Sequence, residues 1–145
     1  MNVQVCTTIE VAPEQLWQRL ERIEDHVDWM ADARSITFVS PQQRGVGTEF
    51  DCLTVVGPMR TTDRMRVTEW APNQAMGIEH RGVVTGRGRF ALLPLGANRT
   101  YFCWEERLTF PWWMGGQVGA ALGRPVLRAI WRRNLTRLKH LAEAG

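Results

Sequence analysis

The stretch RTYFCWEERLTF at residues 99–110 alternates as a β-strand does. Its even-numbered positions, from Phe102 to Phe110, are apolar with one exception, and such alternation predicts a strand with one face on the core. The exception is Glu106, which falls in phase with the apolar side chains. Burial of an unpaired carboxylate is costly, so the interior around Glu106 must supply a hydrogen-bonding partner, a raised pKa or water.

Two alternatives to a cavity-facing Glu106 remain open. In the first, a β-bulge within residues 99–110 reverses the alternation, turns Glu106 outward and places Glu105 inside. In the second, Glu106 forms a structural ion pair with an arginine of the last helix.

The length of 145 residues allows one domain with a full hydrophobic core, so the whole of residues 1–145 is expected to be a single domain. A content of 44% hydrophobic and 23% charged residues is typical of globular proteins and excludes disordered and fibrous classes. Seven tryptophans are many for this length and predict a large aromatic core or an aromatic-lined cavity. No segment approaches about 20 continuous apolar residues, so no membrane-spanning helix is expected.

The three cysteines are Cys6, Cys52 and Cys103, an odd number without the spacing of a disulfide framework. They are therefore expected to be reduced, packed thiols. The N-terminal residues MNVQVCTTIEV lack the basic and apolar regions of a signal peptide, and together these features predict a cytoplasmic protein. No further histidine or cysteine lies at ligand spacing from His26, so no metal site is expected. No cofactor is expected either.

The order of the remaining elements predicts an antiparallel sheet and one long helix. Turn residues such as Gly-Pro at 57–58 separate short apolar segments, which favours hairpins. A first helix opens at Ala12-Pro13-Glu14 and a second short helix covers 25–30. The fold class expected is α+β, a strongly curved seven-stranded sheet wrapped around a C-terminal helix at about 125–142. The predicted strands are 3–11, 34–40, 48–57, 59–70, 74–82, 86–95 and 99–110.

In this order the chain resembles the START-related superfamily, also called Bet v 1-like or SRPBCC, and most of all its polyketide cyclase/dehydrase and lipid-transport branch. The resemblance implies a helix-grip fold with a ligand cavity between sheet and helix. Members bind hydrophobic ligands, cyclise polyketides, carry lipids or assist other proteins, so the fold does not choose among these activities. The stretches that carry the resemblance are VAPEQLW (11–17), DHVDWM (25–30), RGVGTEF (44–50), GPMR (57–60), VTEWAPNQAM (67–76), RFALLPLG (89–96) and TYFCWEERL (100–108).

Alternation and resemblance together give a set of candidate ligand-binding residues. Three inward polar groups, Asp63, His80 and Glu106, are also the candidates for a catalytic acid or base. The ordinary alternative for Asp63 and His80 is a surface or packed side chain. The candidate ligand-binding residues are Phe50, Cys52, Met65, Ile78, His80, Phe90, Phe102, Trp104 and Glu106 from the strands, and Val126, Ile130 and Asn134 from the long helix.

The segment FPWWMGGQVGAALGRP at 110–125 contains four glycines and ends on a proline. These residues disfavour a helix, so the long helix is expected to start near Arg124-Pro125, after a mobile or partly helical stretch. The bulky residues Trp112, Trp113 and Met114 either plug the open end of the cavity or form a gate to it.

Six basic residues follow Trp112, against Glu143 as the one acidic residue, although the net charge of the chain is only +3. A solvated helix face ordinarily accounts for such a bias. The alternative is peripheral contact with a membrane, or with a carrier protein, through the tryptophans and the nearby Arg124 and Arg128. Nucleic-acid binding is not expected, because the basic residues are not interleaved with aromatic ones on one surface.

The leading functional expectation is a small cytoplasmic protein that binds a hydrophobic or aromatic molecule, polyketide-like or lipid-like. The first alternative is a cyclase or dehydratase acting on a polyketide-like substrate, with Glu106, His80 or Asp63 as general acid or base. The second is a co-chaperone or interaction module that uses the outer face of the sheet. The sequence predicts no oligomeric state and does not identify the ligand.

Overall fold

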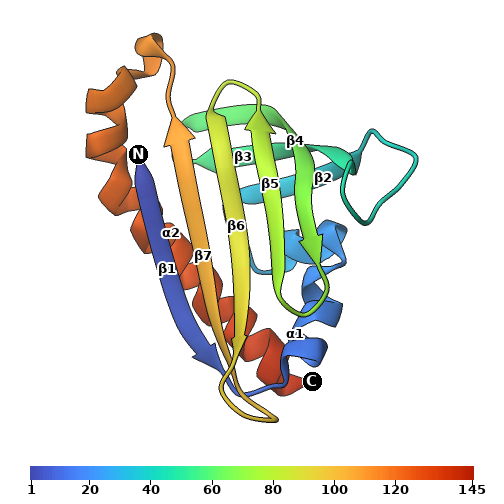
Figure 1. Cartoon of the computed structure of the whole chain (residues 1–145). Coiled ribbons are helices and arrows are strands. Elements are labelled where there is room, and N and C mark those ends of the chain that lie inside the picture. Colours follow the sequence, from blue (N-terminus) through green and yellow to red (C-terminus); the bar gives the residue numbers. More distant parts are fainter.

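The computed structural model describes residues 1–145 (Figure 1). A single sheet lies in front of a long C-terminal helix, and the short helices after the first strand close one end. The elements, in chain order, are β1 (Asn2–Ile9), α1 (Pro13–Leu20), the 3₁₀ helix η1 (Ile23–Asp28), β2 (Ala33–Phe38), β3 (Glu49–Val56), β4 (Met59–Ala71), β5 (Ala75–Arg81), β6 (Thr85–Pro94), β7 (Thr100–Thr109), the 3₁₀ helix η2 (Trp112–Met114) and α2 (Gly116–Ala144).

The sheet has seven antiparallel strands in the order β1-β7-β6-β5-β4-β3-β2. Strands β2 to β7 follow one another through hairpins, while β1 joins the far edge beside β7. Hairpin turns of this kind require left-handed backbone, as at Asn73 with φ 67° in the β4–β5 turn. The predicted α+β fold is confirmed, and each strand lies within two residues of its expected bounds.

Helix α2 packs tightly on the sheet only in its C-terminal half. Leu135 and Leu138 are fully buried there, among core residues that include Leu16 and Leu20 of α1. A straight helix cannot follow a strongly curved sheet along its whole length, so its N-terminal half stands away from the sheet. The space left between them holds the candidate site.

Helix α2 begins at Gly116 and runs through Pro125, whereas the sequence predicts a start near Arg124-Pro125. Gly115, with φ 91°, makes the left-handed turn that joins η2 to the helix. A side chain at Gly119 would overlap the carbonyl of Met114, so this glycine allows a close approach rather than interrupting the helix. Pro125 lies on the exposed side of α2, where water can hydrate the carbonyl that loses its intrahelical donor.

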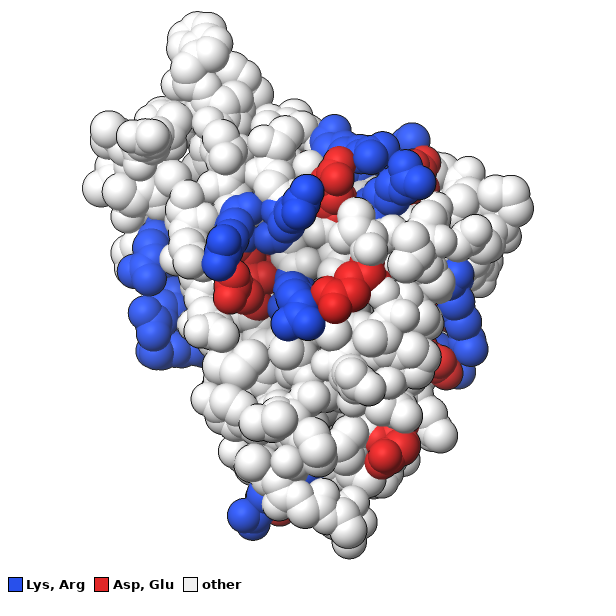
Figure 2. All heavy atoms as spheres, viewed as in Figure 1, with Lys and Arg blue, Asp and Glu red and all other residues white.

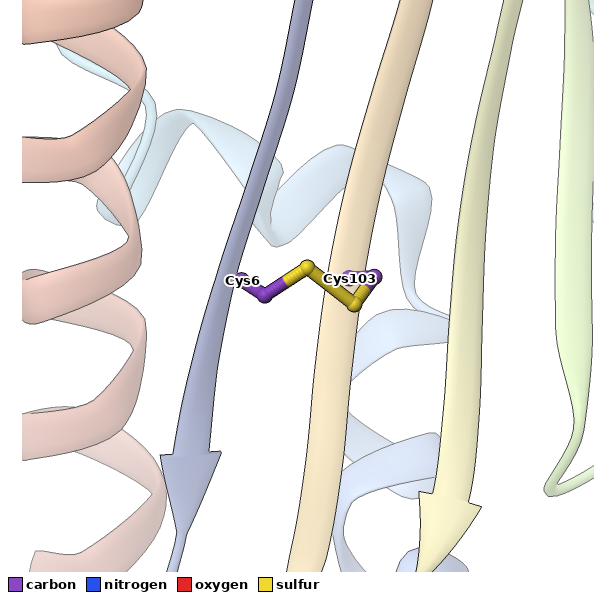
Figure 3. The surroundings of a disulfide bond; sticks show 2 residues. All are labelled: Cys6 and Cys103. Carbon is purple, nitrogen blue, oxygen red and sulfur yellow. A yellow bond between two sulfur atoms is a disulfide. The ribbon is translucent and has the colours of Figure 1, made fainter.

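Cys6 and Cys103 form a disulfide between β1 and β7 (Figure 3). The two residues are direct cross-strand partners with a Cα–Cα distance of 4.1 Å. The expectation of three reduced thiols is therefore wrong for these two. Their 97-residue separation gives no hint of the pairing, which depends on the first strand joining the last. Cys52 is a free, buried thiol, as expected.

Protein isolated without reductant and then denatured is expected to show one reactive thiol per chain, that of Cys52. Reduction before denaturation should raise the count to all three cysteines. Cys103→Ser should lower the free energy of unfolding by about 2–4 kcal/mol, because the disulfide closes a long loop of the unfolded chain. A thiol titration that finds three reactive thiols before reduction would contradict the disulfide.

Candidate functional site

A cavity of about 340 Å³ lies between the concave face of the sheet and the first half of α2. Of the 31 residues that line it, 20 are hydrophobic. This volume and this mostly apolar wall are typical of sites for small organic molecules. Aromatic rings form part of the wall, where Trp104 lies between Phe90 and Trp131. The ring centroids of Phe90 and Trp104 are 5.7 Å apart, and those of Trp104 and Trp131 are 5.2 Å apart.

Most of the candidate ligand-binding residues lie in the cavity wall. Asp63, a candidate for catalysis, lies there too. Those on the strands follow from alternation, because a regular strand directs every second side chain to the same face, whereas Val126 lies on α2. The candidate ligand-binding residues in the wall are Phe50, Cys52, Met65, Ile78, His80, Phe90, Trp104, Glu106 and Val126.

Three of the candidates, Phe102, Ile130 and Asn134, lie outside the cavity wall. Phe102 is fully buried in the packed part of the core, although it shares the inward face of β7. Asn134 has a structural contact, in which its Nδ2 donates a hydrogen bond of 2.7 Å to Oδ1 of Asp32. Ile130 packs against the core cluster. Sequence alternation shows the face of an element but not the depth at which the cavity ends.

A second group of wall residues was not predicted from the sequence pattern, among them His26 and Met30 beside β2 and Trp131 on α2. A short 3₁₀ helix has too few residues for its buried face to be identified by periodicity. Trp131 directly follows Ile130, one of the predicted candidates on the long helix, and was not itself predicted. Its Nε1 donates a hydrogen bond of 3.2 Å to Oδ2 of Asp32.

Glu106 is 4% exposed and faces the cavity. The pairing of β6 and β7 has no register shift, so the alternative with Glu105 inside does not occur. The carboxylate accepts hydrogen bonds of 2.9 Å from Trp104 Nε1 at one oxygen and from His80 Nε2 at the other. Its partner is therefore His80 rather than an arginine of α2.

Glycines in β6 allow Glu106 and His80 to meet. Glu106 lies on β7 and His80 on β5, with β6 between them, and the residues opposite them on β6 are Gly88 and Gly86. A side chain at Gly88 would overlap the Glu106 carboxylate. The bare backbone of β6 therefore leaves the space through which the carboxylate reaches the imidazole.

Asp63 on β4 is the third buried polar group of the wall, with an exposure of 5%. Its Oδ1 accepts a hydrogen bond of 2.8 Å from the backbone N–H of Val83, and its Oδ2 accepts one of 3.1 Å from Thr61. A Cβ at Gly82 would overlap this carboxylate. Asp63 thus supports the β5–β6 turn while adding negative charge close to His80.

The pKa values of the two histidines in the wall are shifted in opposite directions. Burial alone would lower the pKa of His80, but the hydrogen bond to Glu106 and the charges of Glu106 and Asp63 outweigh burial and raise it above its usual value. Burial lowers the pKa of His26 to about 4, despite its 2.7 Å hydrogen bond to the carbonyl of Leu20. His26 is therefore neutral near pH 7, whereas His80 is poised to hold a proton.

The three predicted gate residues are not placed alike. Met114 lies in the cavity wall, whereas Trp112 and Trp113 are 86% and 61% exposed and do not line the cavity. The tryptophans therefore do not plug its open end.

No group of three or more His, Cys, Asp or Glu side chains is arranged to hold a metal ion. No helix is long and apolar enough to cross a membrane.

The sequence model of the family described as polyketide cyclase/dehydrase and lipid transport matches residues 1–143, and the chain belongs to this family. A search of curated proteins finds no match. Among solved structures, a Thermus thermophilus protein superposes with a TM-score of 0.78 at 18% identity, over 99% of this chain and 98% of that one.

Two further solved structures have aromatase/cyclase in their names. The Zhui aromatase/cyclase of a Streptomyces species gives a TM-score of 0.72 at 17% identity, over 99% of this chain and 93% of that one. The two-domain aromatase/cyclase StfQ of the steffimycin biosynthetic pathway gives 0.78 at 14% identity, over 99% of this chain and 51% of that one. At these identities the likeness shows the helix-grip fold alone.

Proposed function

We propose that the cavity binds a small hydrophobic or aromatic molecule, polyketide-like or lipid-like, and that a hydroxyl or carbonyl group of this ligand meets the pair His80 and Glu106. The observation that carries the proposal is a hydrogen-bonded acid–base pair in the wall of an otherwise apolar cavity. The family and the aromatase/cyclase neighbours support a ligand-binding or cyclase role at this coarser level.

The two kinds of wall residue contribute different parts of recognition. Apolar contact supplies affinity, at about 25 cal/mol for each Å² of apolar surface removed from water. The rings of Phe90, Trp104 and Trp131 favour a flat aromatic ligand, because aromatic pairs gain about 0.5–1.5 kcal/mol beyond area burial. The polar pair fixes the orientation, since a buried polar group discriminates strongly against ligands that leave it unpaired.

Titration with the dye 1-anilinonaphthalene-8-sulfonate tests binding without knowledge of the natural ligand. The dye should bind at micromolar concentration, gain fluorescence and quench Trp104. Trp104→Phe should reduce the quenching, to which Trp131 in the same wall also contributes, whereas Trp70→Phe, outside the cavity wall, should leave it in place. Competition by a hydroxylated anthraquinone and by a fatty acid distinguishes the two ligand classes. Quenching that survives Trp104→Phe unchanged would contradict binding in this cavity.

The second candidate function is acid–base catalysis on a polyketide-like ketone, favoured by the raised pKa of His80 beside Glu106. In this proposal the pair removes a proton from the carbon next to a ligand carbonyl and returns it to an oxygen. Aldol cyclisation and dehydration require these proton transfers. The measurable first step is exchange of that carbon-bound proton for deuterium in a β-diketone, followed by NMR. Exchange no faster than in Glu106→Gln would leave binding without catalysis.

The third candidate, an interaction module acting through the outer face of the sheet, has less support. Such a module needs an exposed apolar sheet face, but a cluster of charged side chains of both signs lies across the upper middle of the outer face, as Figure 2 shows. Ion pairs run across it, such as Arg64–Asp51 and Arg89–Glu69.

A cytoplasmic location, expected from the sequence, receives no support from the Cys6–Cys103 disulfide. Disulfides persist in oxidising compartments and are rare in the cytosol. A thiol titration on protein taken directly from cells, with alkylation of free thiols at lysis, measures which redox state the protein holds there.

A further inference from the structure

Five bulky apolar side chains lie exposed on η2 and the first half of α2. We call these residues the docking patch. They contrast with the rest of α2, whose exposed positions from Arg132 to His140 are all polar or charged. The patch consists of Trp112 (86% exposed), Trp113 (61%), Val118 (70%), Leu122 (74%) and Val126 (53%).

The helical part of the patch is a continuous stripe rather than scattered exposed residues. Val118, Leu122, Pro125 and Ala129 follow at intervals of three and four residues and are all exposed, so they share one face of α2. The same face continues into Arg132 and Arg133. A continuous exposed apolar stripe on a helix is typical of a surface that contacts a protein or a membrane.

The charge around the patch has one sign. Residues 107–142 contain no Asp or Glu, but they contain seven Lys and Arg. Arg132 and Arg133 are exposed and form no ion pair within the chain. The projecting end of the molecule, where η2 and the start of α2 lie in Figure 1, carries no charged side chains in Figure 2. Lys or Arg side chains appear further along the same side.

The patch adjoins the cavity. Met114, Gly119, Gly123 and Val126 belong to η2 and α2 and also line the cavity wall. Val126 is shared by the patch and the wall. Whatever covers the patch therefore lies against the helical wall of the cavity.

We propose that the docking patch binds the surface of a bilayer that contains anionic phospholipids. Trp112 and Trp113 enter the interface between headgroups and acyl chains, where tryptophan is favoured, and the apolar stripe of α2 lies along it. Arg132 and Arg133 contact the anionic headgroups. Docking in this way places the helical wall of the cavity at the bilayer, so that an apolar ligand passes between the cavity and the bilayer. The passage of ligand rests on the proposed function, whereas docking itself does not.

A second copy of this chain is a weaker occupant for the same surface. Two patches facing each other would bring two sets of unpaired arginines together without an acidic residue to neutralise them. An anionic surface instead pairs with every one of these charges. Charge complementarity therefore favours the membrane.

Vesicle flotation without any ligand tests the proposal. The protein should float with vesicles of equal parts phosphatidylcholine and phosphatidylglycerol and stay in solution with phosphatidylcholine alone. Trp112→Ala/Trp113→Ala should weaken binding by at least about tenfold, equivalent to about 1.4 kcal/mol. The matched control is Leu93→Ala/Leu95→Ala, which removes two exposed leucines from the β6–β7 hairpin at the other end of the molecule and should bind as the wild type does.

A second variant separates the electrostatic part of the proposal. Arg132→Gln/Arg133→Gln should reduce the preference for phosphatidylglycerol, and raising the salt from about 0.1 M to about 0.5 M should weaken wild-type binding. The proposal is overturned by wild-type protein that does not float, by tryptophan variants that float equally well, or by light scattering that shows a dimer lost in the tryptophan variants. Dye binding in solution should persist in the tryptophan variants, so that failure of docking and failure of ligand binding are told apart.

Discussion

Glu106→Leu is expected to lower the free energy of unfolding by about 1–3 kcal/mol and to remove binding of ligands that carry a hydroxyl or carbonyl group. The loss of stability follows because Trp104 Nε1 and His80 Nε2 would keep their burial and lose their acceptor. Chemical denaturation of the purified variant measures the change.

The neighbouring residue supplies a matched control for this substitution. Glu105 points to the outer face of β7 and pairs with the exposed Arg107. Glu105→Leu should therefore change the free energy of unfolding by less than about 0.5 kcal/mol and leave binding intact. Equal effects at the two positions would mean that the register of β7 differs from the one described.

Glu106→Gln isolates the charge, because an amide oxygen can still accept from Trp104. In the wild type the raised pKa of His80 means that its protonated form stabilises the fold below a pH of about 6.5. This contribution is lost as the pH rises through the folded-state pKa. In Glu106→Gln, burial should dominate and the pKa of His80 should fall below its usual value. The pH dependence of stability should then reverse, because the unfolded chain would bind this proton more tightly than the folded one and stability would fall as the pH falls. NMR titration of the imidazole signals measures the shift, and an unchanged pKa of His80 would contradict the pairing.

Filling the cavity from two opposite walls is expected to weaken dye binding by at least about tenfold, which corresponds to about 1.4 kcal/mol. Ile78 of β5 and Leu127 of α2 both line the cavity, and Ile78→Trp/Leu127→Trp would place two indole rings in its volume of about 340 Å³. Leu93→Trp, on the exposed β6–β7 hairpin, is the control for adding an indole ring outside the cavity. Calorimetric titration with the dye gives both affinities. Undiminished affinity in the filled variant, with its fold intact by circular dichroism, would place the dye elsewhere.

The architecture could be predicted from the sequence because strand alternation and turn residues are local properties. Residues 99–110 alternate so regularly that the inward direction of Glu106 followed from parity alone, provided that no bulge intervened. The start of α2 could not be predicted in the same way. The low helix propensity of Gly115, Gly119 and Pro125 disfavours a helix at these positions. In the structure, however, Gly119 allows the close approach of the Met114 carbonyl and Gly115 makes the left-handed turn.

The polar centre of the site depends on the pairing of distant strands, which one sequence does not show. His80 and Glu106 lie 26 residues apart in the sequence, on strands β5 and β7, with β6 between them. Their side chains meet across β6 because the residues of β6 opposite them are glycines. The Cys6–Cys103 disulfide depends in the same way on β1 joining β7. Phe102 and Asn134 show the reverse error, since they share the correct face but lie beyond the end of the cavity.

The indole N–H signals of the seven tryptophans test the central claim most directly. Trp104 and Trp131 line the cavity, whereas Trp17 and Trp70 pack together outside its wall. Titration of ¹⁵N-labelled protein with a hydroxylated anthraquinone should shift the signals of Trp104 and Trp131 and saturate at one ligand per chain, while those of Trp17 and Trp70 stay in place. Saturating shifts confined to Trp112 and Trp113, or no shift at Trp104, would contradict a ligand site between the sheet and α2.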